Sequence, residues 1–232
     1  MHGLNVSKNG NSLYYAALGY NGETPGLTIL DVNEIQRRVP NPQVHTISHL
    51  TWQSVSLPQV PIPVKINAHP YLIEIDEFAT NGGPLPSSDV NAKVGAARII
   101  DIADESHPRV ISNIRLEVNT PSGRAAAAND PGASSPLQGY AGHYCAVPRR
   151  TDPGIVACSF ILSGLRVFDV RDPYHPKELA YFNAPVHPAV GGGAGSNYAM
   201  SAPAFDSQRR QIWYSDGFDG FYAVKVTNGA WP

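Results

Sequence analysis

The chain has 232 residues, including 21 glycines and 21 prolines, a combined share above that of average proteins. A hydrophobic fraction of 42% and a charged fraction of 16% exclude a coiled coil, a helical bundle and a disordered polyampholyte. The net charge of −2 gives no basic footprint for nucleic acid, and no apolar run is long enough to span a membrane. The composition indicates a chain rich in strands and turns.

Two short patterns recur along the chain in a fixed order. The first begins with His or Ser and continues into β-forming residues, at 2–6, 69–73, 143–147 and 201–205. The second opens with a small residue and closes with a polar residue before a β-branched one, at 26–32, 96–102, 164–170 and 220–226. A polar turn and a second strand join the two patterns, as the alignment of 7–15 with 206–214 indicates.

A fourth strand follows the second pattern in the longer units, at 110–116 and 178–182, and one helical turn is expected at 33–38. Four antiparallel strands that repeat at intervals above 40 residues are typical of β-propeller blades. We therefore expect an all-β, single-domain β-propeller with blades at about 1–66, 67–138, 139–197 and 198–232. A β-sandwich is the alternative. Three long loops at 79–94, 120–138 and 185–197 are the expected contact surfaces.

The two cysteines, Cys145 and Cys158, flank a strong turn signal at 149–154. If the turn is centred between Thr151 and Asp152, the two residues face each other across adjacent antiparallel strands, close enough for a disulfide. Two buried free thiols are the alternative. A disulfide favours a location outside the cytoplasm, although residues 1–6 carry no visible signal peptide.

The segments 164–176 and 97–108 resemble the LVIVD-repeat β-propeller family. In that family a β-rich run ends in Asp-Val and is followed by Asp-Pro and a second proline. Unit one departs from the pattern with Asn33-Glu34, and unit four departs further with Lys225. The resemblance implies a propeller that is commonly bacterial and extracytoplasmic, and it implies no particular activity. The rings of this family are usually larger than four blades.

The repeat count raises the question of whether the ring is complete. Unit four ends after three strands, and no N-terminal segment supplies its outer strand. We expect the chain to be the C-terminal part of a larger propeller, or else a four-bladed ring with one three-stranded blade. An open arc would leave faces uncovered, which makes missing blades or self-association possible.

The candidate site lies at the repeat-equivalent residues His2, His69, His143 and Ser201, which we expect to converge on one end of the central channel. Three imidazoles there would suit copper, iron or zinc. The arrangement is distantly similar to the metal-carrying histidines of the selenium-binding protein and methanethiol oxidase propellers, without a motif match. The alternative is that these histidines only hydrogen-bond to neighbouring backbone.

Glu74 and Asp76 alternate onto one face of a strand, where paired carboxylates can bind a cation or transfer protons. A solvated strand face is the favoured interpretation. The function that the sequence best supports is an extracytoplasmic binding module for an unknown protein or small-molecule ligand. The rival is a metal-dependent oxidoreductase that uses His2, His69 and His143.

Overall fold

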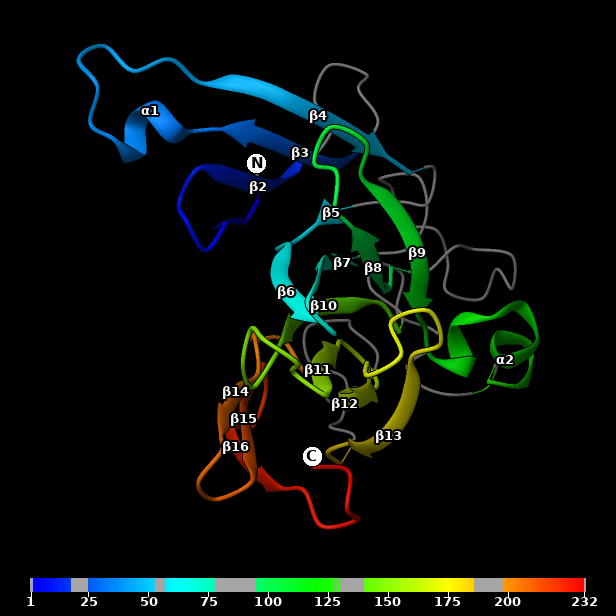
Figure 1. Cartoon of the computed structure of the whole chain (residues 1–232). Coiled ribbons are helices and arrows are strands. Elements are labelled where there is room, and N and C mark those ends of the chain that lie inside the picture. The colour runs from blue at the N-terminus through cyan, green and yellow to red at the C-terminus, as the bar shows by residue number, and fades with distance from the viewer. Residues whose placement is uncertain are drawn as a thin grey trace.

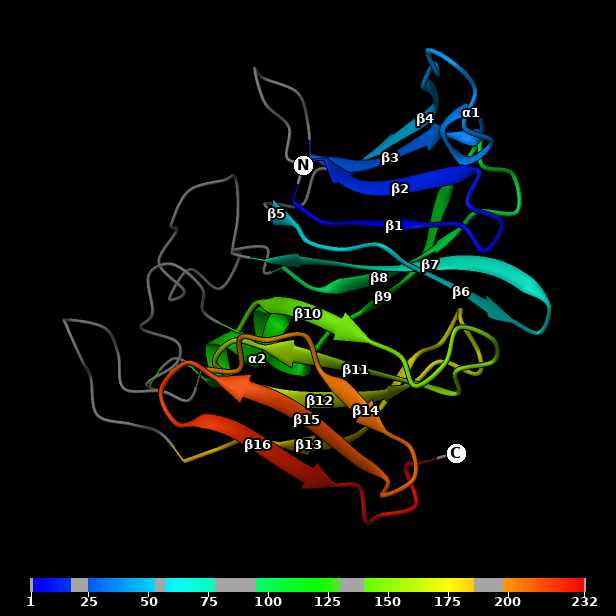
Figure 2. The same ribbon diagram turned by 90° about the vertical axis from the view of Figure 1, so that its left-hand side faces the viewer.

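The computed structural model describes residues 2–17, 25–52, 57–77, 95–127, 129, 140–185 and 198–231. Four antiparallel sheets stack on one another in chain order, each with its first strand innermost (Figure 1; Figure 2). This is the all-β propeller architecture that the repeats predicted. No helix in the described ranges has the length and apolar character of a membrane span.

The blades are consecutive in the sequence. Blade 1 contains β1 (Leu4–Val6), β2 (Ser12–Ala17), β3 (Gly26–Asp31) and β4 (His45–Thr51). Blade 2 contains β5 (Leu57–Pro58), β6 (Ile62–Ile66), β7 (His69–Glu77), β8 (Ala97–Asp101) and β9 (Arg109–Ile114). Blade 3 contains β10 (Gly142–Ala146), β11 (Ile155–Phe160), β12 (Gly164–Asp169) and β13 (Lys177–Phe182). Blade 4 contains β14 (Ala204–Asp206), β15 (Gln211–Asp216) and β16 (Gly220–Lys225).

Helical structure is short. The expected turn is α1 (Asn33–Gln36), and a 3₁₀ turn at Glu117–Asn119 leads into α2 (Pro121–Ala126). The predicted loop at 120–138 therefore begins with a helix, which Thr120 caps by accepting a hydrogen bond from the Gly123 amide. The predicted loop at 79–94, residues 130–138 of the second loop and residues 186–197 of the third lie outside the described residues.

The aspartates of the second sequence pattern end the third strand of each blade. The carboxylates of Asp31, Asp101 and Asp169 each accept a hydrogen bond from the backbone N–H two residues further on, at 2.8, 3.0 and 2.9 Å. This Asx-type contact offers the chain a turn in place of further strand pairing. Lys225 holds this position in blade 4, and an ammonium group accepts no hydrogen bond.

Apolar side chains fill the three blade-to-blade interfaces. Tyr14, Leu27 and Ile29 of blade 1 pack against Leu72 and Ile100 of blade 2. The interface of blades 2 and 3 is lined by Ile73, Ile75, Ile99, Val156, Cys158 and Phe160. That of blades 3 and 4 is lined by Ile155, Ala157, Leu165, Ile212 and Tyr214. Each sheet is thus stabilised by its neighbours and not by a separate core, as expected for stacked repeats.

The predicted boundary between the first two blades is misplaced. Residues 57–66 were assigned to blade 1, but β5 and β6 both pair with β7 and belong to blade 2. The first strand of blade 2 is therefore 62–66 and not 69–73, and His69 opens the second strand. The pattern at 69–73 matched the first strands of the other units because β-forming residues after a His or Ser do not distinguish a first strand from a second.

The cysteine hairpin has the predicted register. Cys145 pairs with Cys158, and Ala146 pairs with Ala157, in antiparallel strands β10 and β11. The two cysteines are joined in a disulfide with their Cα atoms 4.0 Å apart, and the described residues contain no free cysteine. The disulfide lies in the interface of blades 2 and 3, where both cysteines are buried.

Candidate functional site

The first strands of blades 1 to 3 share one direction, so the stack has two ends (Figure 2). We call the end where β1, β6 and β10 begin the strand-start end. The opposite end carries the β1–β2, β6–β7 and β10–β11 turns, and we call it the hairpin end. The predicted site residues are divided between these two ends.

His143 lies at the strand-start end, buried between blades. Its Nδ1 is hydrogen-bonded to the Met200 carbonyl oxygen, and its Nε2 lies 3.5 Å from Oε1 of Glu77 in blade 2. Burial lowers the pKa of His143, the Met200 bond opposes this effect, and nearby His2 lowers it further. His143 is therefore held neutral by its surroundings, with Nδ1 as the protonated nitrogen because it faces a carbonyl.

Ser201 lies at the same end, but its hydroxyl is hydrogen-bonded to the backbone. Its hydroxyl accepts a hydrogen bond from the Ser215 amide at 2.7 Å, and its carbonyl accepts one from the Ser159 hydroxyl at 2.6 Å. His2 is exposed next to the first strand of blade 1. Of the four predicted site residues, the structure thus brings His2, His143 and Ser201 to one end.

His69 lies at the other end, which contradicts the predicted convergence. It opens β7 at the hairpin end, where Nε2 lies 2.8 Å from Oδ1 of Asp101, and Arg109 contacts the other oxygen of Asp101 at 2.9 Å. In blade 2, Gln59 lies beside the strand-start end, and its Nε2 donates to Glu77 at 2.5 Å. The described part of the chain contains no group of three His, Cys, Asp or Glu side chains arranged to hold a metal ion.

Glu74 and Asp76 share a face of β7 as alternation predicted, but the expectation that they are solvated is wrong. Both are buried, and both accept hydrogen bonds from Arg98 of the neighbouring strand, the Asp76 bond being 2.5 Å long. Trp52 donates to Asp76 at 3.0 Å, and its ring lies 3.9 Å from the guanidinium carbon. Burial raises the pKa of Glu74, and the Asp76 charge adds to this effect.

Glu74, Asp76, Arg98 and Trp52 form what we call the buried charge cluster. Its position between blades 1 and 2 and its burial favour a structural role. Glu74 and Asp76 share the guanidinium of Arg98, and the charge of Arg115 also favours the ionised form of Asp76. Burial nevertheless raises the pKa of both carboxyls, because it disfavours their charged forms. Glu74 Oε1 and Asp76 Oδ1 have no hydrogen-bond partner among the described residues, in keeping with a pair that is only partly compensated.

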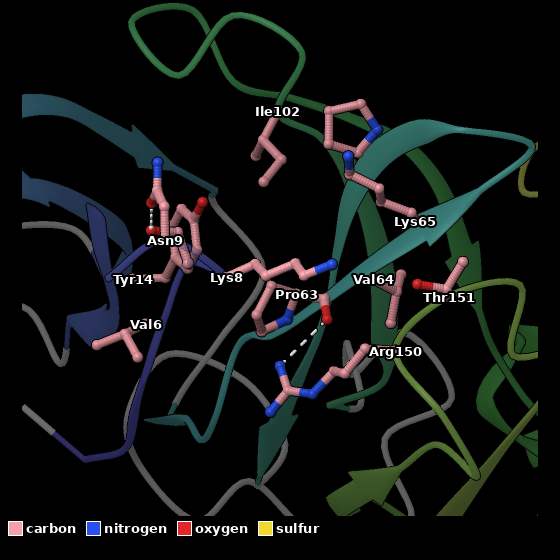
Figure 3. Close-up of a pocket in the computed structure, with 12 residues that line it drawn as sticks. Val6, Lys8, Asn9, Tyr14, Pro63, Val64, Lys65, Ile102, Arg150 and Thr151 are labelled. Carbon is pink, nitrogen blue, oxygen red and sulfur yellow. Dashed lines mark hydrogen bonds between the residues drawn. The ribbon is translucent and has the colours of Figure 1, made fainter. Parts of the chain in front are cut away.

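A pocket of about 830 Å³ opens at the hairpin end, where the turns of three blades meet (Figure 3). Tyr14 of blade 1 and Ile102 of blade 2 form its apolar wall. The other lining residues are Val6, Ser7, Lys8, Asn9, Pro63, Val64, Lys65, Pro70, Arg150 and Thr151. Figure 3 shows the Lys8 side chain extending from the β1–β2 turn towards β6.

The pocket is basic. Among the described residues, it is lined by three cationic residues, Lys8, Lys65 and Arg150, and by no Asp or Glu. Arg150 donates to the Pro63 carbonyl at 3.1 Å and to Oδ1 of Asn5 at 2.9 Å, and both of these acceptors are neutral. Arg150 therefore connects all three blades without losing its charge to a carboxylate in the described residues. Burial lowers the pKa of Arg150, although an arginine stays protonated.

Glu105, which contacts Tyr14 of the apolar wall, is already engaged. Glu105 accepts hydrogen bonds from the Tyr14 hydroxyl at 2.5 Å and from the Ser12 hydroxyl at 2.6 Å. Burial, and then the bond to Glu105, raise the pKa of Tyr14, so its phenol remains a protonated donor. This carboxylate is turned to its own hydroxyl partners instead of lining the pocket.

Sequence reasoning missed this pocket. Lys8, Lys65 and Arg150 lie in three different units, and no motif links them. One weak signal was present, because Lys8 and Arg150 lie in predicted hairpin turns between the first two strands of a blade. Such turns meet at one end of a propeller, but the sequence alone did not place the turn of blade 2 at 67–68.

Comparison with known proteins gives a fold but no family. No protein-family model and no curated protein matches the chain, whereas 26 chains of solved structures do. The computationally designed protein Ika4 is 13% identical, with 97% of this chain and 90% of that chain covered and a TM-score of 0.49. The Cps50 (Swd1) β-propeller domain of Myceliophteria thermophila is 10% identical, with coverage of 97% and 52% and a TM-score of 0.50. This chain spans about half the length of the Cps50 chain and shares its propeller fold.

Proposed function

We propose that this chain is an extracytoplasmic binding module that holds a small molecule with an anionic group in the hairpin-end pocket. The observation that carries this proposal is the lining of the pocket, which in the described part of the chain has three cations, no carboxylate and an apolar wall. Its volume of about 830 Å³ is within the range of small-molecule sites. A carboxylate, sulfonate or phosphate group would meet the cations, and an apolar body would lie against Tyr14 and Ile102.

The two lysines are the residues that would respond most to a ligand. Neither side chain makes a hydrogen bond or an ion pair with another described residue, so a bound anion would displace no internal partner. Arg150 differs because its guanidinium is already held by Asn5 and Pro63. We assign Lys8 and Lys65 to ligand attraction and Arg150 to holding the three turns together.

The proposed location rests on two observations. The Cys145–Cys158 disulfide is of a kind that persists in oxidising compartments and is rare in the cytosol of most organisms. The resemblance of 164–176 to the LVIVD repeat points in the same direction, towards a secreted or surface-exposed bacterial propeller. Immunodetection in cell fractions of the source organism tests this part, and recovery in the cytosolic fraction alone would contradict it.

Calorimetric titration with a matched pair of probes tests the site. Naphthalene-2-carboxylate carries a charge and an apolar body, and naphthalene-2-carboxamide has nearly the same shape without the charge. We expect the carboxylate to bind more tightly, and we expect Lys8→Met and Lys65→Met each to weaken its binding roughly two- to fivefold, as for partly exposed charge pairs. Amide binding should be unchanged in both variants.

Lys177→Met is the control, since this exposed lysine lies on β13, away from the pocket. It should leave carboxylate binding at the wild-type value. Equal affinities for the two probes, no binding of either, or equal effects of Lys65→Met and Lys177→Met would each refute an anion site here.

A further inference from the structure

Blades in the middle of the arc use both faces of their sheets. In blade 2, Leu72 packs in the interface with blade 1, whereas Ile73 and Ile75 pack in the interface with blade 3. Successive strand residues alternate between faces, and residues paired across strands share a face. Blades 1 and 4 lie at the two ends of the arc (Figure 1), and the described residues place no blade on the outer face of either.

The outer face of blade 1 is apolar. Tyr14 faces blade 2, so Leu13 and Tyr15 face outwards, together with their strand partners Val6 and Leu4. Leu4 is 44% exposed and Val6 is 50% exposed. Exposed aliphatic side chains that adjoin one another on a sheet indicate a surface that is covered in the working protein.

The outer face of blade 4 is aromatic. Ile212 and Tyr214 face blade 3, so Trp213 and Ser215 face outwards with their partners Ala223 and Phe221. Phe221 is 63% exposed, and its ring centroid lies 6.0 Å from that of Trp213. Aromatic residues of this kind are enriched at the centres of protein–protein interfaces.

Each outer face is equivalent in position to one side of the blade-to-blade interfaces that recur within the chain. Counted forward from the residue that pairs with the last residue of the third strand, Trp213 occupies the place of Tyr14, Ile73 and Ala157, which face the next blade. By the same count Leu13 occupies the place of Leu72, Val156 and Ile212, which face the preceding blade. Within the described residues, one chain thus carries one face with no following blade on it and one face with no preceding blade on it.

We propose that a second copy of this chain covers both faces. Blade 4 of each copy packs on blade 1 of the other, so that two sets of four blades close one ring. Two arcs of four blades supply eight blades, which is within the range of known propellers. The contact is head-to-tail and is made twice, once at each junction. The inner strands of both copies would then surround a common channel, next to the hairpin-end pockets.

The oligomeric state tests this proposal and does not depend on any ligand. Sedimentation velocity and light scattering should give twice the 24.9 kDa mass of the chain. Val6→Glu and Phe221→Glu place a charge on one outer face each, at side chains exposed enough to tolerate it in the folded monomer. Each variant alone should be monomeric, because every junction needs both faces. Circular dichroism confirms that the blades remain folded.

Tyr181→Glu is the matched control, since Tyr181 is 68% exposed on the outermost strand of blade 3 and lies on neither outer face. It should remain dimeric. A mixture of the Val6→Glu and Phe221→Glu variants should form a weaker dimer, because the mixture restores one junction. Three results would overturn the proposal: a monomeric wild-type chain at high micromolar concentration, a dimer of Phe221→Glu alone, or open-ended polymers.

Discussion

The buried charge cluster is the sharpest place to test how this fold is held together. Arg98 is only 2% exposed, and its guanidinium binds Glu74 and Asp76 and lies against the Trp52 ring. Arg98→Met keeps an unbranched, apolar side chain of similar reach but removes the charge. Two buried carboxylates then lose their cation.

The expected loss of stability is large. Removal of one partner from a buried ion pair costs roughly 3–5 kcal/mol, because the remaining charge is left uncompensated. The cation–π contact with Trp52 overlaps with this loss and is not added to it. Urea unfolding followed by tryptophan fluorescence measures the change at pH 7. A typical domain is stable by only about 5–15 kcal/mol, so the variant should be marginally folded.

The loss should depend on pH. Burial raises the pKa of Glu74 and of Asp76 above their unfolded values. Such groups favour the folded state below the unfolded pKa, and this contribution disappears as the pH rises through the folded pKa. Without Arg98 both folded pKa values rise further, so the variant is penalised most near neutral pH. The difference between wild type and variant should therefore shrink from about pH 7 to about pH 5.

Arg166→Met is the matched control. Arg166 holds the equivalent position in the third strand of blade 3, but its partner Glu178 is partly exposed, at 2.8 Å. We expect a loss of at most about 1 kcal/mol, with little dependence on pH. Equal losses for the two variants, or a loss in Arg98→Met that stays constant with pH, would refute the view that desolvated carboxylates set the cost.

Three further results are expected from unfolding and thiol measurements. Replacing both Cys145 and Cys158 with Ala should cost about 3 kcal/mol, because the disulfide spans 13 positions, and a count of two free thiols in unreduced, denatured wild-type protein would rule this out. Gly164→Ala should lower the free energy of unfolding more than Gly220→Ala does. The loss for Gly220→Ala should be about 1–2 kcal/mol, from its positive φ alone. Both glycines have positive φ, but a Cβ at Gly164 would lie 2.2 Å from a carbonyl oxygen, whereas at Gly220 nothing lies within 4 Å; similar losses would contradict the clash. Phe160→Ala should cost about 3–5 kcal/mol in urea titrations, since this ring is fully buried between blades 2 and 3, and a loss below that of Gly220→Ala would contradict this.

Local patterns predicted the third strand of each blade well. A small residue permits the turn into this strand, and in three units a strand-ending aspartate binds the backbone two residues on, so the pattern has a cause within a few residues. The cysteine register was predictable for the same reason, because a tight turn fixes which residues of a hairpin face each other. Both features depend on contacts close in sequence.

The first strands and the site depend on contacts that a local pattern does not contain. His69 resembled His143 in its neighbours, yet the extra strands β5 and β6 precede it and move it one strand outwards. Alternation placed Glu74 and Asp76 on one face, but that face is buried because blade 1 packs on it, and the cross-strand pairing of Glu74 with Arg98 supplies the counter-charge. The basic pocket needs turns from three blades, and their meeting follows from the curvature of the stack.

Equivalent strand positions of the blades carry different side chains at the blade interfaces. These differences determine which blade faces can pack on each other. In the face towards the preceding blade, blade 2 presents Glu74 and Asp76, whereas blade 3 presents Cys158 and Phe160 at the equivalent positions. Trp52 of blade 1 donates a hydrogen bond to Asp76 of blade 2. Another blade packed on this face without such a donor would leave the carboxylates of blade 2 less compensated, so this face of blade 2 favours blade 1 as its neighbour. Blade 1 presents Tyr15 and Ala17 there, with no charge to satisfy. Its outer face therefore brings no charge to a junction with Trp213 and Phe221 of blade 4, and Lys225 at the edge of the blade 4 face is exposed.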